Sequence, residues 1–282
     1  MARSFVAKLL VATLTGTATW SLCATSEAQN SRPTPARRPA AKAPQELGVT
    51  GARPITRPTG NLIAQAYQKT QDAATIDDYT EIIQLCQHAL PGEQDPSVRK
   101  YVEQLLAWAA NRRGEAYSQE ASQYHAAGQT EKALKSDEQA LGDFTIAVMS
   151  DPSKWKSLHN KGVSLALVGR YDDALEDLTK ALELKNDYVN TWFNRAEVRY
   201  ELGQYEDAAA DYGEVIQRQP DDFGAFTGRG HAYFRLGDFE KALADYHRAV
   251  TLDKESAGAL VNRGDTYRQL GQYEKAAADY RT

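Results

Sequence analysis

Three asparagines recur at equivalent places in the C-terminal half of the chain. Asn194 follows Asn160 by 34 residues, and Asn262 follows Asn194 by twice that interval. A side-chain amide donates and accepts hydrogen bonds at the same time, so it can hold the backbone of an extended peptide. Phe193 and Tyr200 stand nearby as apolar anchors. The pattern predicts a row of peptide-binding side chains.

A base and an acid recur with the same period. The base directly follows the asparagine position, and the acid comes sixteen residues after the base. We expect a ladder of ion pairs between the two helices of each repeat or between neighbouring repeats, with solvated charges as the alternative. Partly buried, bidentate pairs would orient the helices more than stabilise them. The residues are Lys161, Arg195, Arg229 and Arg263 with Asp177, Asp211, Asp245 and Asp279.

Catalytic chemistry has little support in the sequence. Glu197, His231 and Asp265 share one repeat position and are types that bind metals. Neighbouring helix axes lie roughly 8–10 Å apart, which is too far for ligation at ~2 Å. Gly228-x-Gly230 begins like a dinucleotide-binding loop, but the third glycine and the preceding strand are missing. We expect no enzyme activity, no catalytic residue, no metal and no cofactor.

These residues are positioned by a pattern that returns every 34 residues. A glycine marks each return, an aromatic residue follows it by two residues, and an alanine follows it by five. Glycine supplies the positive φ that ends one helix before the next begins. Such a hairpin cannot bury its apolar face alone, so we expect a stack of hairpins. The marking glycines are Gly169, Gly203, Gly237 and Gly271.

The second unit carries the full spacing that resembles the tetratricopeptide repeat, a 34-residue helix-turn-helix family. This resemblance implies an all-α fold, a right-handed α-solenoid of stacked repeats, over residues 152–282. The units lie near 155–188, 189–222, 223–256 and 257–282, and the last one is incomplete. The spaced residues are Trp192, Ala196, Tyr205, Ala208, Tyr212 and Pro220.

In this family the first helices form a concave groove that binds a partner peptide or helix. A solvated groove without a ligand is the alternative. Relatives that clamp a C-terminal carboxylate use bases where this chain has Gly224 and Gly228, so that binding mode is not expected. The resemblance places in the groove Asn160, Asn190, Phe193, Asn194, Glu197, Tyr200, His231, Phe234, Arg235, Asn262 and Arg268.

Residues 1–28 are typical of a secretory signal peptide. Arg3 and Lys8 precede an apolar run over residues 9–24, and Ser26-Glu27-Ala28 fits a small-x-small cleavage site. The alternative is an uncleaved membrane anchor, although the run is shorter than the ~20 residues of a span. A lipidated Cys23 is disfavoured by the residues before it. We therefore expect an extracytoplasmic protein, periplasmic or secreted.

Residues 29–59 read as a disordered, basic, Pro-rich linker. Six prolines stand among six bases and one acid, with few apolar residues. Such a segment cannot repay its ordering entropy by burying apolar surface. It serves either as a spacer or as a ligand for an anionic envelope polymer.

Residues 60–151 read as divergent, elongated helical repeats. Residues 60–91 resemble a degenerate unit, and Asp95-Pro96 is a helix start. From Gly114 to Gly128 there are fourteen residues where later units have seven, so each helix of this repeat should be about seven residues longer. Cys86 is the only cysteine left after signal removal, and a small core residue is its expected role.

Composition and repeats together favour a non-catalytic protein–protein interaction scaffold outside the cytoplasm. The formal net charge of −5 and the hydrophobic fraction of 42% fit a soluble protein and argue against a nucleic-acid partner. We expect a protein or peptide partner, and membrane contact only through an uncleaved signal anchor. The incomplete last unit favours a fragment of a longer protein. The alternative function is therefore the recognition module of a larger enzyme whose catalytic domain lies beyond residue 282.

Overall fold

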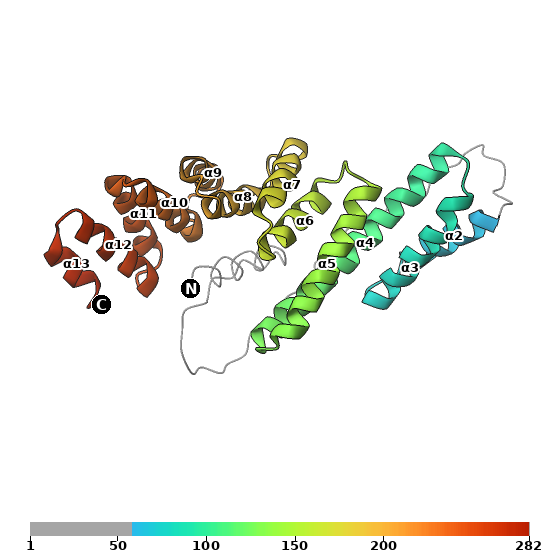
Figure 1. The fold of residues 1–282 in the computed structure, drawn as a ribbon, viewed down its shortest axis with the longest axis horizontal. Coiled ribbons are helices and arrows are strands. Elements are labelled where there is room, and N and C mark those ends of the chain that lie inside the picture. The colour runs from blue at the N-terminus through green and yellow to red at the C-terminus, as the bar shows by residue number, and fades with distance from the viewer. Residues whose placement is uncertain (1–57, 282) are drawn as a thin grey trace. The chain divides into compact units, whose positions relative to one another are not determined.

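The computed structural model describes residues 58–281, which fold into helices joined by short turns (Figure 1). Within this range there is no β-strand, and none of its helices combines the length and apolar character of a membrane span. The described residues divide into two compact units, 58–164 and 165–281. The predicted signal peptide and linker lie outside the described residues, except for the last two linker positions.

The N-terminal unit consists of short helices followed by a long hairpin (Figure 1). As predicted, Asp95 caps a helix that begins at Pro96: its carboxylate accepts hydrogen bonds from the backbone N–H groups of Ser97 and Val98. The elements are α2 (Pro58–Lys69), α3 (Ile76–Ala89), the 3-10 turn η1 (Leu90–Gly92), α4 (Pro96–Ala126), α5 (Thr130–Ser150) and the start of α6 (Trp155–Leu167).

Cys86 lies in the core of this unit, as expected from the sequence. Its side chain is buried among Ile82, Val102 and Leu105. Burial raises the pKa of the Cys86 thiol to about 12. The thiolate, which is the reactive form, is therefore scarce at neutral pH.

The α4–α5 hairpin is an elongated version of the later repeats. Arg113 pairs with Asp143 and Gly114 packs against Phe144, each pair 30 residues apart, whereas the matching pair Gly230 and Tyr246 is 16 apart. The difference of fourteen residues agrees with the prediction of about seven extra residues in each helix. At 31 residues α4 is longer than the 13-residue α8 by more than the seven residues added at the turn, because it also runs back to its predicted cap at Asp95.

The C-terminal unit is a succession of helical hairpins (Figure 1). In each hairpin the two helices contact each other, and the second helix also contacts the first helix of the next hairpin. The helices after α6 are α7 (Tyr171–Leu184), α8 (Val189–Glu201), α9 (Tyr205–Arg218), α10 (Phe223–Leu236), α11 (Phe239–Leu252), α12 (Ala257–Gln269) and α13 (Tyr273–Asp279).

The predicted glycine turns are confirmed. Gly203 has φ 76° and Gly237 has φ 79°, in the left-handed region that L-residues with a side chain rarely adopt. Gly237 ends α10, and its backbone N–H bonds to the carbonyl of Phe234. The turn therefore closes each first helix and reverses the chain within a few residues.

Tyrosine rings of the second helices pack directly on glycines of the first helices. Tyr212 is 1% exposed, and a Cβ added at Gly228 would lie 2.4 Å from its ring. Tyr246 occupies the same kind of space beside Gly230. The ring of each second helix thus fills volume that only a residue without a side chain leaves open.

We expect Gly228→Ala to destabilise the protein by about 1–3 kcal/mol, because its methyl group would overlap the confined Tyr212 ring. This cost exceeds the gain of up to ~1 kcal/mol in helix propensity. Urea unfolding measures the effect. The matched control is Gly142→Ala in α5, where a Cβ meets nothing within 4 Å and the propensity gain should appear as added stability. A stabilised Gly228→Ala variant would contradict the packing.

Candidate partner-binding face

Three of the four predicted ion pairs form inside single hairpins of the C-terminal unit. Each arginine on a first helix binds both carboxylate oxygens of an aspartate on the second helix, at 2.6–2.8 Å. The pairs are thus internal to each hairpin and orient its two helices. They are Arg195 with Asp211, Arg229 with Asp245, and Arg263 with Asp279.

Two features of this ladder differ from the sequence interpretation. The pairing of Lys161 with Asp177 would cross the boundary between the two units and stays a prediction. An additional pair, Arg113 with Asp143, has the same bidentate geometry in the N-terminal unit, at 2.7–2.8 Å. The sequence contained a pattern that could have predicted this pair, because Arg113 precedes Gly114 just as Arg229 precedes Gly230.

The predicted groove residues Tyr200, His231 and Asn262 connect three consecutive first helices. The rings of Tyr200 on α8 and His231 on α10 have centroids 6.4 Å apart. The Asn262 amide on α12 donates to His231 Nε2 at 2.9 Å, so this nitrogen must be the unprotonated one. Burial lowers the pKa of His231, with the Asn262 hydrogen bond opposing it, which favours the neutral ring.

Arg235 completes this surface beside Tyr200. Its guanidinium carbon lies 4.7 Å from the ring centroid of Tyr205 and 5.9 Å from that of Tyr200. We name the surface formed by Tyr200, His231, Arg235 and Asn262 the first-helix face. It offers aromatic rings, an amide oxygen and one exposed cation to the surroundings.

Comparison with known proteins identifies the repeat. A family model for the tetratricopeptide repeat matches residues 193–254 and again 227–282, and a second TPR repeat model matches residues 165–203. Residues 165–282 are therefore tetratricopeptide repeats. Proteins of this family are typically non-catalytic scaffolds that bind protein or peptide partners. A comparison with curated proteins found no match.

Solved structures show the same tetratricopeptide repeat fold. A crystal structure of MamA is 18% identical, covers 54% of this chain and 90% of its own, and has a TM-score of 0.51. MamA from residue 41 to its end, from Desulfovibrio magneticus RS-1, is 22% identical, covers 60% and 91%, and has a TM-score of 0.52. At these identities the likeness concerns the fold alone.

Several predicted groove residues of the tetratricopeptide repeats are not available to a partner in this structure. Phe193, Asn194 and Glu197 are buried, and Phe193 packs edge-on against Tyr212 with ring centroids 5.6 Å apart. Phe193 and Glu197 both contact Tyr212, the large tyrosine of the second helix. Asn190 and Phe234 are half-buried, and Arg268 is exposed.

Asn160 lies in the N-terminal unit and belongs to a buried polar network. Its amide donates to Asn111 Oδ1 at 3.1 Å and to Glu115 Oε1 at 3.3 Å. Burial alone would raise the pKa of Glu115, but Lys156 and Arg112 outweigh it and lower this pKa. The Asn160 amide therefore anchors an internal carboxylate, and the interpretation as a peptide ligand is corrected.

The repeat position shared by Glu197, His231 and Asp265 serves a contact that sequence reasoning missed. Tyr212 donates its hydroxyl hydrogen to Glu197, and Tyr280 donates to Asp265 Oδ1 at 2.8 Å. Between them, Tyr246 places its ring 5.7 Å from that of His231. The sequence pattern that could have revealed this contact is a tyrosine fifteen residues after each of these three positions. Over residues 58–281 no group of His, Cys, Asp and Glu could hold a metal ion.

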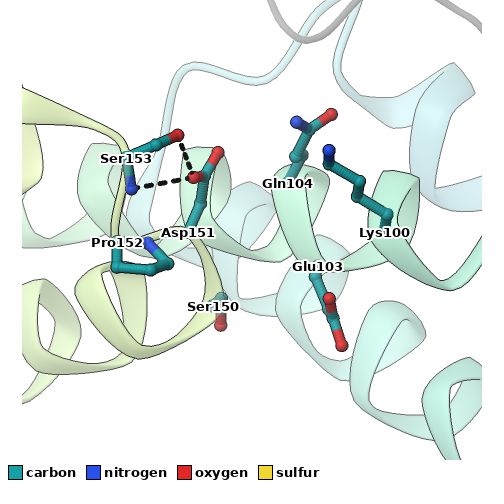
Figure 2. Close-up of a pocket in the computed structure, with 7 residues that line it drawn as sticks. All are labelled: Lys100, Glu103, Gln104, Ser150, Asp151, Pro152 and Ser153. Carbon is teal, nitrogen blue, oxygen red and sulfur yellow. Dashed lines mark hydrogen bonds between the residues drawn. The ribbon is translucent and has the colours of Figure 1, made fainter.

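A separate hollow lies in the N-terminal unit, where α5 leads into α6 (Figure 2). Asp151 turns one carboxylate oxygen to Ser153, which donates from N at 3.1 Å and from Oγ at 2.6 Å. Lys154 Nζ lies 3.5 Å from the other oxygen. The Asp151 carboxylate thus contacts residues of its own turn. The hollow is lined by Lys100, Glu103, Gln104, Ser150, Asp151, Pro152 and Ser153.

Proposed function

We propose that this tetratricopeptide repeat protein is an extracytoplasmic scaffold whose first-helix face holds an extended or helical segment of a partner protein. The observation that carries the proposal is the connection of α8, α10 and α12 through Tyr200, His231 and Asn262. A surface continuous over three repeats suits a segment several residues long, since one hairpin alone presents little area.

The chemistry of this face also suits a peptide. The Asn262 amide nitrogen is used by His231, and its carbonyl oxygen accepts from a peptide N–H in our proposal. Tyr200 and Phe234 are half-buried aromatics that can pack against apolar side chains. Phe234 is held in place by an edge-on contact with Phe239, with ring centroids 5.3 Å apart.

Site-specific photo-crosslinking tests the face. Val261 on α12, next to Asn262, is 46% exposed, and Leu184 at the end of α7 is 49% exposed. A photoreactive phenylalanine at Val261 is expected to capture a partner in cells of the source organism, because this position borders the proposed binding surface. The same group at Leu184 is the matched control. Equal capture at both positions, or capture at Leu184 alone, would rule out the first-helix face.

The proposed location rests on residues 1–28 and has its own test. A phosphatase that folds only outside the cytoplasm, fused after residue 59, is expected to be active because the apolar run directs export. The control is the same fusion without residues 1–28, which should be inactive. Activity in neither fusion would refute the extracytoplasmic location and leave the first-helix face untouched.

A further inference from the structure

Arg235 differs from the other arginines between residues 165 and 280. Between residues 165 and 280 each of the others lies in an ion pair with an aspartate or glutamate, such as Arg248 with Asp221 at 2.7 Å. Within the described part of the chain no carboxylate pairs with Arg235, although its side chain is exposed. The first-helix face therefore presents a guanidinium whose charge is not neutralised by this unit.

The guanidinium of Arg235 is also oriented in advance. It stacks on the Tyr205 ring, at 4.7 Å from the centroid, and lies 5.9 Å from the centroid of the Tyr200 ring. Tyr200 and Tyr205 hold each other edge-on at 5.3 Å. A planar group fixed on an aromatic face loses less conformational freedom when it binds a ligand, and its remaining N–H donors suit the two oxygens of a carboxylate.

The acids of the first helices on this face form no ion pair with Arg235 in the described part of the chain. Glu197 on α8 is buried under Tyr212. Glu201 on α8 acts on the Tyr200 hydroxyl through its charge, without an ion pair to Arg235. Across the face, Asp265 is engaged by the Tyr280 hydroxyl and by Arg268. An incoming carboxylate would therefore compete with Glu201, which follows Tyr200 in the sequence.

We propose that the segment held by the first-helix face carries an aspartate or glutamate side chain that pairs with Arg235. This inference rests on the proposed function and specifies the chemistry of the partner. It differs from a clamp for a C-terminal carboxylate, since the positions of such a clamp are occupied by Gly224 and Gly228.

A random twelve-residue peptide library displayed on phage and selected on the full chain tests the proposal. Enriched peptides should share an acidic position, and a fluorescein-labelled synthetic copy gives the affinity by fluorescence polarisation. Arg235→Ala should weaken binding about tenfold, the size expected for one charge-assisted pair. Arg248→Ala is the control, because this exposed arginine on α11 already pairs with Asp221. Glu201→Gln should tighten binding.

A charge swap gives the decisive readout. A peptide with its acid replaced by lysine should bind Arg235→Glu better than it binds the natural protein, which a merely structural role for Arg235 would not produce. Enriched peptides without acids, or unchanged affinity in Arg235→Ala, would overturn the inference. If Tyr200→Ala still abolishes binding in that case, the proposed function survives. Absence of any enriched peptide counts against both.

Discussion

Replacing Asp211 with alanine is expected to lower the free energy of unfolding by about 3–5 kcal/mol, the usual cost of removing one partner of a buried ion pair. Asp211 is 2% exposed and accepts from both Arg195 and Arg199, at 2.7–2.8 Å. Its loss would leave two guanidinium groups close together without a counter-charge. The midpoint and slope of urea unfolding measure the change.

Two further variants calibrate this prediction. Asp245→Ala removes a single pair whose arginine is 23% exposed, so its cost should be smaller. Glu214→Ala breaks an exposed pair with Arg218 on α9 and should cost less than about 1 kcal/mol. If Asp211→Ala were no worse than Glu214→Ala, the ladder would be a set of solvated charges rather than a structural element.

Glu197→Gln should remove a pH dependence of stability that runs against the usual behaviour of acids. Burial raises the pKa of Glu197 from its ordinary value of 4.5 to about 7, with the hydrogen bond from Tyr212 opposing. Between these values the folded protein keeps a proton that the unfolded chain has lost. Stability therefore falls as pH rises, by about 1.4 kcal/mol per unit and about 3 kcal/mol by pH 8.

The glutamine variant keeps an acceptor for the Tyr212 hydroxyl but cannot ionise. The difference in unfolding free energy between this variant and the natural protein should thus be small at pH 4.5 and should grow to about 3 kcal/mol at pH 8. Urea unfolding at one-unit steps measures it, and comparison of the two proteins cancels the titration of His231. Glu206→Gln, at an exposed glutamate on α9, is the control. Parallel pH profiles would show that Glu197 is not buried in its neutral form.

The repeating elements could be predicted because their causes are local. A glycine with positive φ ends each first helix, and this requirement is visible at Gly203 and Gly237 in the sequence itself. The arginine–aspartate pairs were also predictable, since a fixed spacing inside a hairpin brings the same two positions together each time. Residues 165–281 therefore have helices and pairs at the expected places.

The accessible surface could not be predicted in the same way, because it depends on which side chain covers another. Asn194 shares its repeat position with Asn262, yet Asn194 is fully buried and Asn262 is half-buried. The repeats around the two positions differ as well: Gly228 leaves room for the Tyr212 ring between α9 and α10. The charge of Arg235 is another such property, since it depends on which side chains of the other described helices lie next to it.

The lengthened hairpin of α4 and α5 shows that one dimension of the architecture can change freely. Arg113 with Asp143 and Gly114 with Phe144 keep the contacts of a standard repeat although fourteen residues have been added between them. Seven residues make about two helical turns, so in both helices the residues beyond the insertion face the same direction as before. Extra turns can thus be added at the tip of a hairpin as a projecting arm, while the contacts at its base remain those of a standard repeat.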